Sequence, residues 1–264
     1  MNLRTTFESF SRYSVEAIEE ITEGSKFKDT ITPWNHLNKP ISVGQCLQLY
    51  KLLGASSPQD FAMRYLDSGE ELERLLIERP KSEHSILKKL HGRTEEQLLI
   101  VAHKFLKKLD PTRYTLDDVV LYLWIRLFYQ THVGAHRELL AKQALQELYP
   151  HVRFQESSAE LDANYAIDLE CYQGEQLICG IQVKPESYYF GRSPNTQGAK
   201  FQNREKHQKY SDTFQVPVCE VIATQQGEVL KIYTTAEPRT FHQLDYVHPQ
   251  LTTFNPFDPR KKEA

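Results

Sequence analysis

Four polar residues interrupt two runs that otherwise resemble sheet interior, between Ala166 and Pro185. The first run carries Asp168 and Glu170, and the second carries Gln182 and Lys184. Buried strands rarely hold such groups unless they are paired or bind an ion. Two acids, an amide oxygen and an ammonium group suit a hard divalent cation and the water that it polarises.

The two runs flank a glycine-containing turn and are typical of a β-hairpin. Because side chains alternate across a strand, the two acids share one face, and Gln182 and Lys184 share one face. A loop of residues 174–176 would place Asp168 directly opposite Gln182, so that all four polar groups point the same way. The apolar residues expected on the other face, as packing surface, are Ile167, Leu169, Ile181 and Val183.

A predicted helix ahead of the hairpin, from Gly134 to Tyr149, offers a further acid. Ala141 and Leu145 lie on its core-facing stripe, and Glu138 stands one turn before Ala141 on the same face. Alternatively, Glu138 only favours the positive end of the helix dipole. Clustered carboxylates persist mainly where a cation neutralises them, which favours Mg²⁺ and metal-dependent phosphodiester hydrolysis.

The order of Asp168, Gln182 and Lys184 resembles the PD-(D/E)XK nuclease superfamily. That signature has an Asp on one strand, an acidic residue, any residue and Lys on the next, and often a Glu on the first core helix. The resemblance implies that Asp168 binds the metal, that Lys184 is catalytic, and that Glu138 is the helix acid.

Gln182 departs from the signature, because it occupies the position of the usual Glu or Asp. It contributes an amide oxygen without charge, as some members of the superfamily do. The resemblance therefore implies that metal affinity depends more on Asp168, on the Val183 carbonyl, and on Glu138 or Glu170.

Longer segments are similar to type II restriction endonucleases of the MjaI-like group. They are "CGIQVKPESYY", "REKHQKY" and "NKPISVGQCLQLY". The resemblance covers about half of the chain and is best across residues 160–222. It implies a restriction-endonuclease-like α/β fold with a mixed sheet flanked by helices, Mg²⁺ as cofactor and double-stranded DNA as substrate. Cleavage of a palindromic duplex also implies a homodimer, with two sites related by a dyad.

Basic and aromatic side chains follow Lys184 along the chain and are expected to contact DNA. Basic residues outnumber acidic ones between Lys184 and Lys209, although the net charge of the whole chain is −3. Alternatively, the aromatic residues are core residues that cover the sheet edge. The residues concerned are Tyr188, Tyr189, Arg192, Asn195, Lys200, Gln202, Arg204, Lys206 and Lys209.

The segment "WNHLNKPISVGQ", residues 34–45, is the candidate for base reading in the N-terminal part. Its polar side chains have the donors and acceptors that recognise base edges. Ordinary loop composition explains the same residues equally well. The residues proposed to contact DNA are Asn35, His36, Lys39 and Gln45.

The rest of the chain predicts two regions, a mainly helical one over 1–114 and the nuclease core over 115–264. The expected helices cover 5–20, 43–53, 58–78, 95–109, 115–129 and 196–213, and the expected strands cover 165–172, 177–184, 216–223 and 229–234. Cysteine spacing, the lack of a secretory leader and the lack of a long apolar stretch favour a reduced, soluble, cytoplasmic protein without membrane contact.

Rival interpretations remain open at this point. A repair or structure-specific nuclease would use the same residues, and a DNA-binding module with a decayed site would explain Gln182. His132 and His136 have the spacing of a metal pair, but they lack a third ligand and are interpreted as capping or surface histidines.

Overall fold

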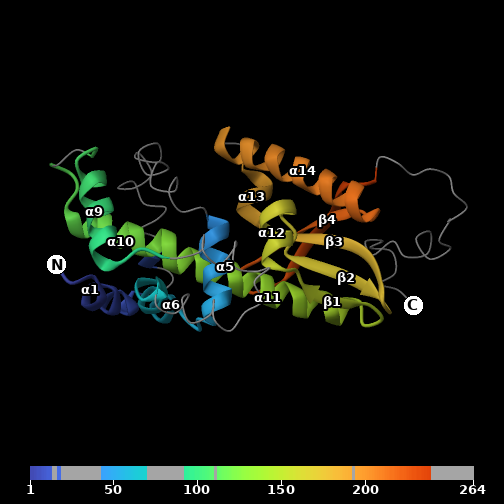
Figure 1. Cartoon of the computed structure of the whole chain (residues 1–264), viewed down its shortest axis with the longest axis horizontal. Coiled ribbons are helices and arrows are strands. Elements are labelled where there is room, and N and C mark those ends of the chain that lie inside the picture. Colours follow the sequence, from blue (N-terminus) through green and yellow to red (C-terminus); the bar gives the residue numbers. More distant parts are fainter. Residues whose placement is uncertain (14–16, 19–42, 70–91, 110–111, 192–193, 239–264) are drawn as a thin grey trace, which may run out of the picture. The chain divides into compact units, whose positions relative to one another are not determined.

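The computed structural model describes residues 1–13, 17–18, 43–69, 92–109, 112–191 and 194–238 (Figure 1). The chain divides into two compact units, Met1–Ala135 and His136–Ala264. Packing thus assigns residues 116–129 to the first unit, whereas the sequence suggested a division at residue 114. The apolar side chains of 116–129 are the reason, because they complete the helical core. Among the described residues, no helix is both long enough and apolar enough to cross a bilayer.

The first unit is helical, and its helices begin where the sequence supplies caps. Ser57 and Thr94 accept hydrogen bonds from backbone N–H groups of the first turn, and Thr115 forms a capping box with Asp118. The described elements are α1 (Leu3–Ser9), η1 (Phe10–Arg12), α5 (Val43–Leu53), α6 (Pro58–Leu66), α9 (Glu95–Leu106), α10 (Leu116–Trp124), η4 (Ile125–Tyr129) and the start of α11 (Gln130–Leu148).

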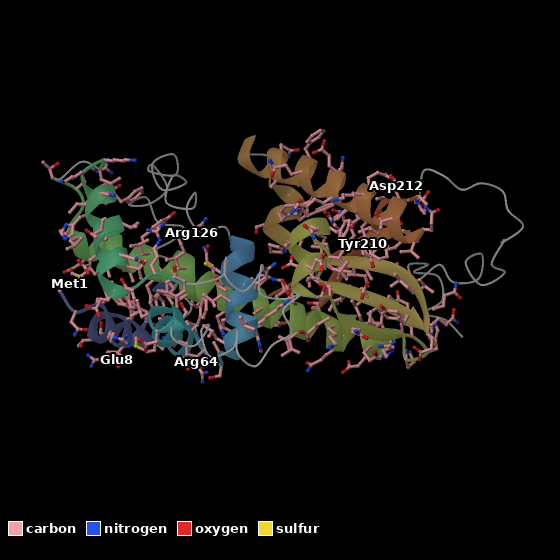
Figure 2. All side chains as sticks on the ribbon, viewed as in Figure 1. Met1, Glu8, Arg64, Arg126, Tyr210 and Asp212 are labelled. Atoms are coloured by element: carbon pink, nitrogen blue, oxygen red, sulfur yellow. The ribbon has the colours of Figure 1, made fainter. Side chains whose placement is uncertain are left out.

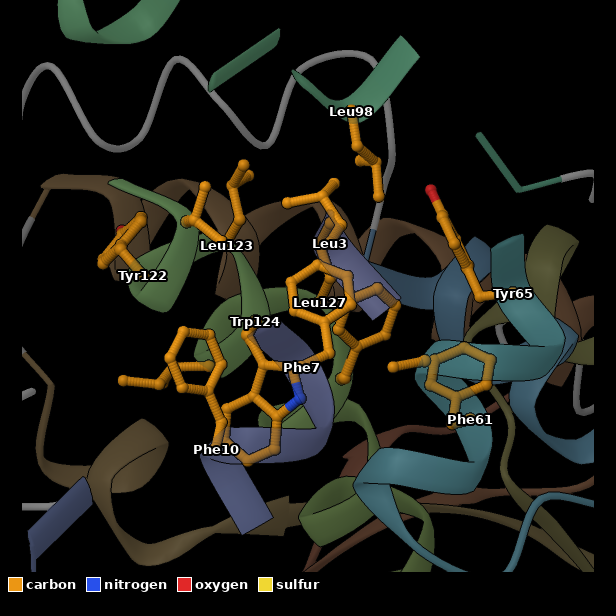
Figure 3. Close-up of a cluster of buried hydrophobic side chains, with 14 of the residues drawn as sticks. Leu3, Phe7, Phe10, Phe61, Tyr65, Leu98, Tyr122, Leu123, Trp124 and Leu127 are labelled. Carbon is orange, nitrogen blue, oxygen red and sulfur yellow. The ribbon is translucent and has the colours of Figure 1, made fainter. Parts of the chain in front are cut away.

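Aromatic side chains form the centre of this unit (Figure 3). Phe128 meets Phe7, Phe61 and Tyr65 edge to face, with ring centroids 5.3, 5.7 and 5.2 Å away. Such pairs add about 0.5–1.5 kcal/mol beyond the area that they bury. This core anchors the long helical segment that continues into the second unit.

The sequence suggested a break before Gly134. The helical segment from 116 onward is instead continuous through this residue. Helix α10 passes through a turn of π-helix, η4, directly into α11. A Cβ at Gly134 would meet nothing within 4 Å, so this glycine occupies open space on the helix. The glycine costs the helix about 1 kcal/mol relative to alanine, which is not enough to end it.

The second unit is an α/β fold with a five-stranded mixed sheet, which confirms the expected class. The strands are β1 (Arg153–Glu156), β2 (Leu169–Gln173), β3 (Gln176–Pro185), β4 (Val218–Ala223) and β5 (Val229–Ala236), in that order across the sheet. Among the described strands, only β3 and β4 pair in parallel. A parallel pair needs a long crossover, and α14 (Pro194–Phe214) forms it.

The two faces of the sheet have different coverings (Figure 1). On one face, Ala141 and Leu145 of α11 belong to a buried cluster with Leu169, Ile181 and Val183. On the other face, Tyr210 of α14 packs with Ile167, Val218 and Ala236. The prediction that Ile167 shares the face of Ile181 and Val183 is therefore wrong. Ile167 precedes β2, where the strand alternation does not hold.

Three short elements were not expected from the sequence. They are β1, α12 (Ala159–Tyr165) and α13 (Glu186–Phe190). Ser158 caps α12, and Ala166 ends it with a left-handed φ of 57°. The strand expected from residue 165 therefore begins only at Leu169. A helix this short gives almost no periodic signal in the sequence.

The β2–β3 hairpin has the expected register near the site but a different turn. Gln173 pairs with Gln176, so the loop has two residues and Gly174 adopts a φ of 59°. An irregularity after Cys171 adds one residue on β3 and restores the pairing of Leu169 with Ile181. The bulge thus replaces the third loop residue of the predicted turn.

We predict that Gly180→Ala destabilises the sheet unit. A Cβ at Gly180 would lie 2.7 Å from Cε1 of Tyr210 and 3.0 Å from Cδ1 of Ile167, both in a packed core. We expect a loss of about 1–3 kcal/mol in the free energy of unfolding, measured by urea titration. Gly198→Ala on α14 is the control, because its Cβ meets nothing within 4 Å. Equal stability of the two variants would contradict this packing argument.

Candidate functional site

Asp168 lies just before β2 and is attached to β3 at two points. Its N–H donates to the Ile181 carbonyl at 2.8 Å, and its carboxylate Oδ2 accepts from the Val183 N–H at 2.7 Å. The carboxylate therefore takes the place of a backbone acceptor at the edge where β2 has not yet begun. The side chain is buried, at 5% exposure, and lies beside the main chain of Gln182.

The carbonyl of Val183 points to the same edge as its N–H. Within a strand both groups of one residue point to the same neighbour, because hydrogen-bonded pairs exchange both bonds. The Gly180 N–H donates to the carbonyl of Pro217, which precedes β4. Even-numbered residues of β3 therefore direct their backbone groups toward β4, and odd-numbered residues such as Val183 direct theirs toward β2. The Asp168 carboxylate and the Val183 carbonyl thus lie on the same side of β3, toward β2. Their role as metal ligands stays a prediction.

Gln182 is held by α14. Its Oε1 accepts from Nδ2 of Asn203 at 3.1 Å, and the same amide donates to the Tyr188 hydroxyl at 3.2 Å. Gln182 is 3% exposed. Burial is the main cause that raises the pKa of Tyr188 to about 12, so this hydroxyl stays protonated at neutral pH.

Lys184 extends from the end of β3 on the same face as Gln182, because two residues separate them in the strand. Its ammonium group lies 5.5 Å from the centre of the Tyr188 ring, and the ammonium of Lys200 lies at the same distance from that ring. Gln182, Lys184 and Tyr188 are therefore gathered on the side of the sheet that α14 covers.

Glu220 on β4 is a buried acid in this region that the sequence reasoning missed. It pairs with Gln182 in the parallel register and is 4% exposed. The Tyr233 hydroxyl donates to its Oε2. An isolated acid within the apolar run "VCEVIA" is the signal that could have drawn attention to it. The parallel pairing that makes it a neighbour of Gln182 cannot be deduced from local pattern.

Glu170, predicted as a metal ligand, is held by two tyrosines. Tyr210 donates to its Oε1 at 2.8 Å, and Tyr172 donates to its Oε2 at 3.0 Å. Burial and the hydrogen bond to Glu170 raise the pKa of Tyr210. Figure 2 labels Tyr210 on α14. Both oxygens thus have structural partners, which favours a role of Glu170 in joining α14 to the sheet.

Glu138 is buried, at 9% exposure, on the stripe of α11 that includes Ala141 and Leu145. The stripe faces the same cluster as Val183, so the predicted inward position of Glu138 is confirmed. Its neighbour Arg137 has a buried Nε, and burial lowers the pKa of that guanidinium. The role of Glu138 as a metal ligand stays a prediction.

Among the expected DNA-contacting residues, Tyr188 and Tyr189 lie on α13, where their hydroxyls accept hydrogen bonds from Asn203 and Lys231. The others divide into three groups. Lys200 donates to the carbonyls of Tyr189 and Gly191 at 2.9 and 3.2 Å, and Lys206 donates to the Ala163 carbonyl at 2.8 Å. Both lysines therefore stabilise the fold through hydrogen bonds to the main chain. Residues that are exposed on α14 are Gln202, Arg204 and Lys209. Residues outside the described part of the chain are Asn35, His36, Lys39 and Arg192, and the side chains of Gln45 and Asn195 are likewise not described.

The donor set fits a hard cation by kind of atom, but it is poor in charge. Asp168, Gln182 and the Val183 carbonyl offer oxygen, which Mg²⁺ prefers. Within the described ranges, however, no three side chains of His, Cys, Asp or Glu gather as ligands for an ion. Neutral oxygens would therefore have to complete the coordination around Asp168.

No family model, curated protein or solved structure matches this chain. The resemblance to restriction endonucleases therefore rests on the sequence motifs alone.

We predict that Tyr210→Phe costs more stability than Tyr172→Phe. Both changes remove one hydrogen bond to Glu170, but Tyr210 is fully buried whereas Tyr172 is half-buried and water can replace its hydroxyl. A buried hydrogen bond to a charged group is worth about 1.5–3 kcal/mol. Urea unfolding measures both variants, and equal losses would show that Glu170 is not fixed by the buried contact.

We predict an acid sensitivity that arises from His207 on α14. The pKa of this imidazole is lowered to about 4, first by burial and second by the charge of the nearby Lys184. The unfolded chain takes up the proton near pH 6.5, so it binds more protons than the folded chain between pH 6.5 and 4. Stability therefore falls as the pH drops through this window, by about 3 kcal/mol at pH 4 for this residue.

The measurement is urea unfolding of the protein and of His207→Leu at several pH values between 7 and 4. The variant should lose less stability than the unchanged chain over that range. Parallel losses in the two proteins would mean that His207 is not held neutral in the folded state.

Proposed function

We propose that the chain is a Mg²⁺-dependent endonuclease that cleaves double-stranded DNA at a specific short sequence. The observation that carries the proposal is the attachment of the Asp168 carboxylate to Val183, next to Gln182 and Lys184. The order and types of these residues resemble the PD-(D/E)XK superfamily. The longer motifs resemble type II restriction endonucleases, for which the mixed sheet between helices is a compatible frame.

In this proposal each residue has a separate task. Asp168 and the Val183 carbonyl hold the ion at the edge beside β3, and Gln182 adds a neutral oxygen. Glu138 adds a charge from α11. Bound Mg²⁺ would acidify a water molecule and neutralise charge on the scissile phosphate. Lys184 orients that water or stabilises the charge that develops on the phosphate.

The exposed side of α14 would meet the DNA backbone. Arg204 and Lys209 are exposed there, and phosphate contacts of this kind fix the register of a protein on DNA. Sequence choice would have to come from side chains that reach base edges, with residues 34–45 as our candidate. A palindromic target would require a homodimer.

We predict that Asp168→Asn and Lys184→Gln each reduce cleavage by at least about 100-fold, because each removes an acid–base or electrostatic contribution. The assay is digestion of mixed-sequence plasmid DNA with Mg²⁺, and discrete fragments are expected from the unchanged chain. Lys142→Gln is the control, because Lys142 pairs with Glu156 on the surface at 3.2 Å.

The same assay distinguishes the rival functions. A repair or structure-specific nuclease would nick branched or damaged DNA without discrete fragments. A DNA-binding module with a decayed site would bind DNA but leave it intact under every condition. Full cleavage by either the Asp168 or the Lys184 variant would overturn the assignment of roles.

A further inference from the structure

Two aromatic side chains are exposed on the sheet unit, on the helices that follow β3. Phe190, the last residue of α13, is 66% exposed and Phe201 on α14 is 64% exposed, the highest values among the large apolar side chains that the structure describes. Neither residue belongs to the buried clusters on the two faces of the sheet. Apolar side chains gain free energy when they leave water, so neighbouring exposed ones mark a surface that makes contacts.

Hydrogen bonds from α14 bring these two residues together. Gln197 donates from Nε2 to the Gly191 carbonyl at 3.0 Å, and Lys200 donates to the same carbonyl at 3.2 Å. Gly191 directly follows Phe190, and Gln197 lies one turn before Phe201 on the same side of α14. The side of α14 that carries Phe201 is therefore the side that is bound to the end of α13.

Cationic side chains gather around α13. The ammonium of Lys231 lies 4.4 Å from the centre of the Tyr189 ring. The ammonium groups of Lys184 and Lys200 each lie 5.5 Å from the centre of the Tyr188 ring. Within the described ranges, none of these three lysines forms an ion pair with an acid. Neighbouring like charges repel one another, so this surface favours an anionic partner.

The exposed residues of the two helices keep this positive excess. Arg204 adds a further exposed cation on α14, while the exposed acids on α13 and the first half of α14 are Glu186 and Glu205. A second copy of this chain is a poor partner for such a surface. An isologous contact would bring the same lysines of both copies together.

Nucleic acid has both properties that this surface requires. Its phosphates are anionic, and every base has a flat face on which a phenyl ring can stack. Bases are open to such contacts only where they have left the helical stack, as in a single strand or at a distorted step of a duplex.

We propose that Phe190 and Phe201 stack on unstacked bases of a bound DNA strand, whose phosphates contact Arg204 and Lys231. This inference rests on the DNA binding in the proposed function but not on cleavage. Stacking tolerates every base, so the two rings hold distorted DNA beside Lys184 without selecting its sequence.

The test measures binding of the full chain in EDTA to two fluorescein-labelled oligonucleotides of equal length, by fluorescence anisotropy. One is a single strand of mixed sequence, and the other has abasic sites in place of all bases. We expect Phe190→Ala and Phe201→Ala each to weaken binding to the first strand at least about fivefold, the lower limit for losing one stacked base. Their affinity for the abasic strand should equal that of the unchanged chain.

Three further variants separate stacking from other kinds of contact. The double variant Phe190→Leu with Phe201→Leu keeps apolar side chains without rings, so it too should lose affinity for the strand with bases. Arg204→Gln should weaken binding to both strands, because both carry phosphates. Leu148→Ala changes an exposed apolar residue at the end of α11 and should alter neither affinity. Urea unfolding checks that each variant is folded, and the leucine variant decides if an alanine variant is not.

The outcomes separate this inference from the proposed function. If the unchanged chain binds neither the single strand nor a mixed-sequence duplex, both proposals fail. If it cleaves the duplex but binds the strand with bases no better than the abasic strand, the inference is rejected and the proposed function stands.

Three other results would overturn the inference alone. Equal weakening on both strands would mean that the phenylalanines act through the fold. Full affinity in the leucine double variant would mean that the contact is apolar without stacking. A changed oligomeric state of the alanine variants in size-exclusion chromatography would assign the two rings to a contact between copies.

Discussion

The hydrogen bond from the Val183 N–H to the Asp168 carboxylate is the interaction on which the candidate site depends. A side chain completes the β2–β3 ladder at the point where the main chain of β2 has turned away. A buried backbone N–H without a partner would cost free energy, so the acid satisfies a structural need as well as offering an oxygen to a ligand. The position of Asp168 is thus fixed without any bound ion.

The sheet separates packing from chemistry. Apart from Glu138, the buried residues between the sheet and α11 are apolar and give the strands their common core, whereas the face toward α14 holds Glu170, Gln182 and Glu220. Tyrosine hydroxyls and the Asn203 amide compensate these buried groups. Such a polar layer stays specific only while its members keep their partners, because low dielectric makes each unpaired group expensive.

Much of the second unit could be predicted from the sequence, because alternating strands and a long polar helix give strong periodic signals. The register that brings Asp168 to Gln182 was also predicted, although the turn was wrong and a bulge compensates the difference. Glu220 was not predicted, because its place beside Gln182 depends on a parallel pairing between strands more than thirty residues apart. Helix α12 was missed because a capped helix of only seven residues between two strands leaves almost no periodic pattern.

Three of the four cysteines lie in the sheet unit, on the strands β2, β3 and β4, and Cys171 and Cys179 face one another directly. Cys46 lies alone in the helical unit, where burial raises its pKa to about 12. Every thiol is therefore shielded from alkylating reagents while its own unit is folded. Mass spectrometry of the alkylated peptides would therefore measure how fast each unit unfolds, separately for the two units and without any added label.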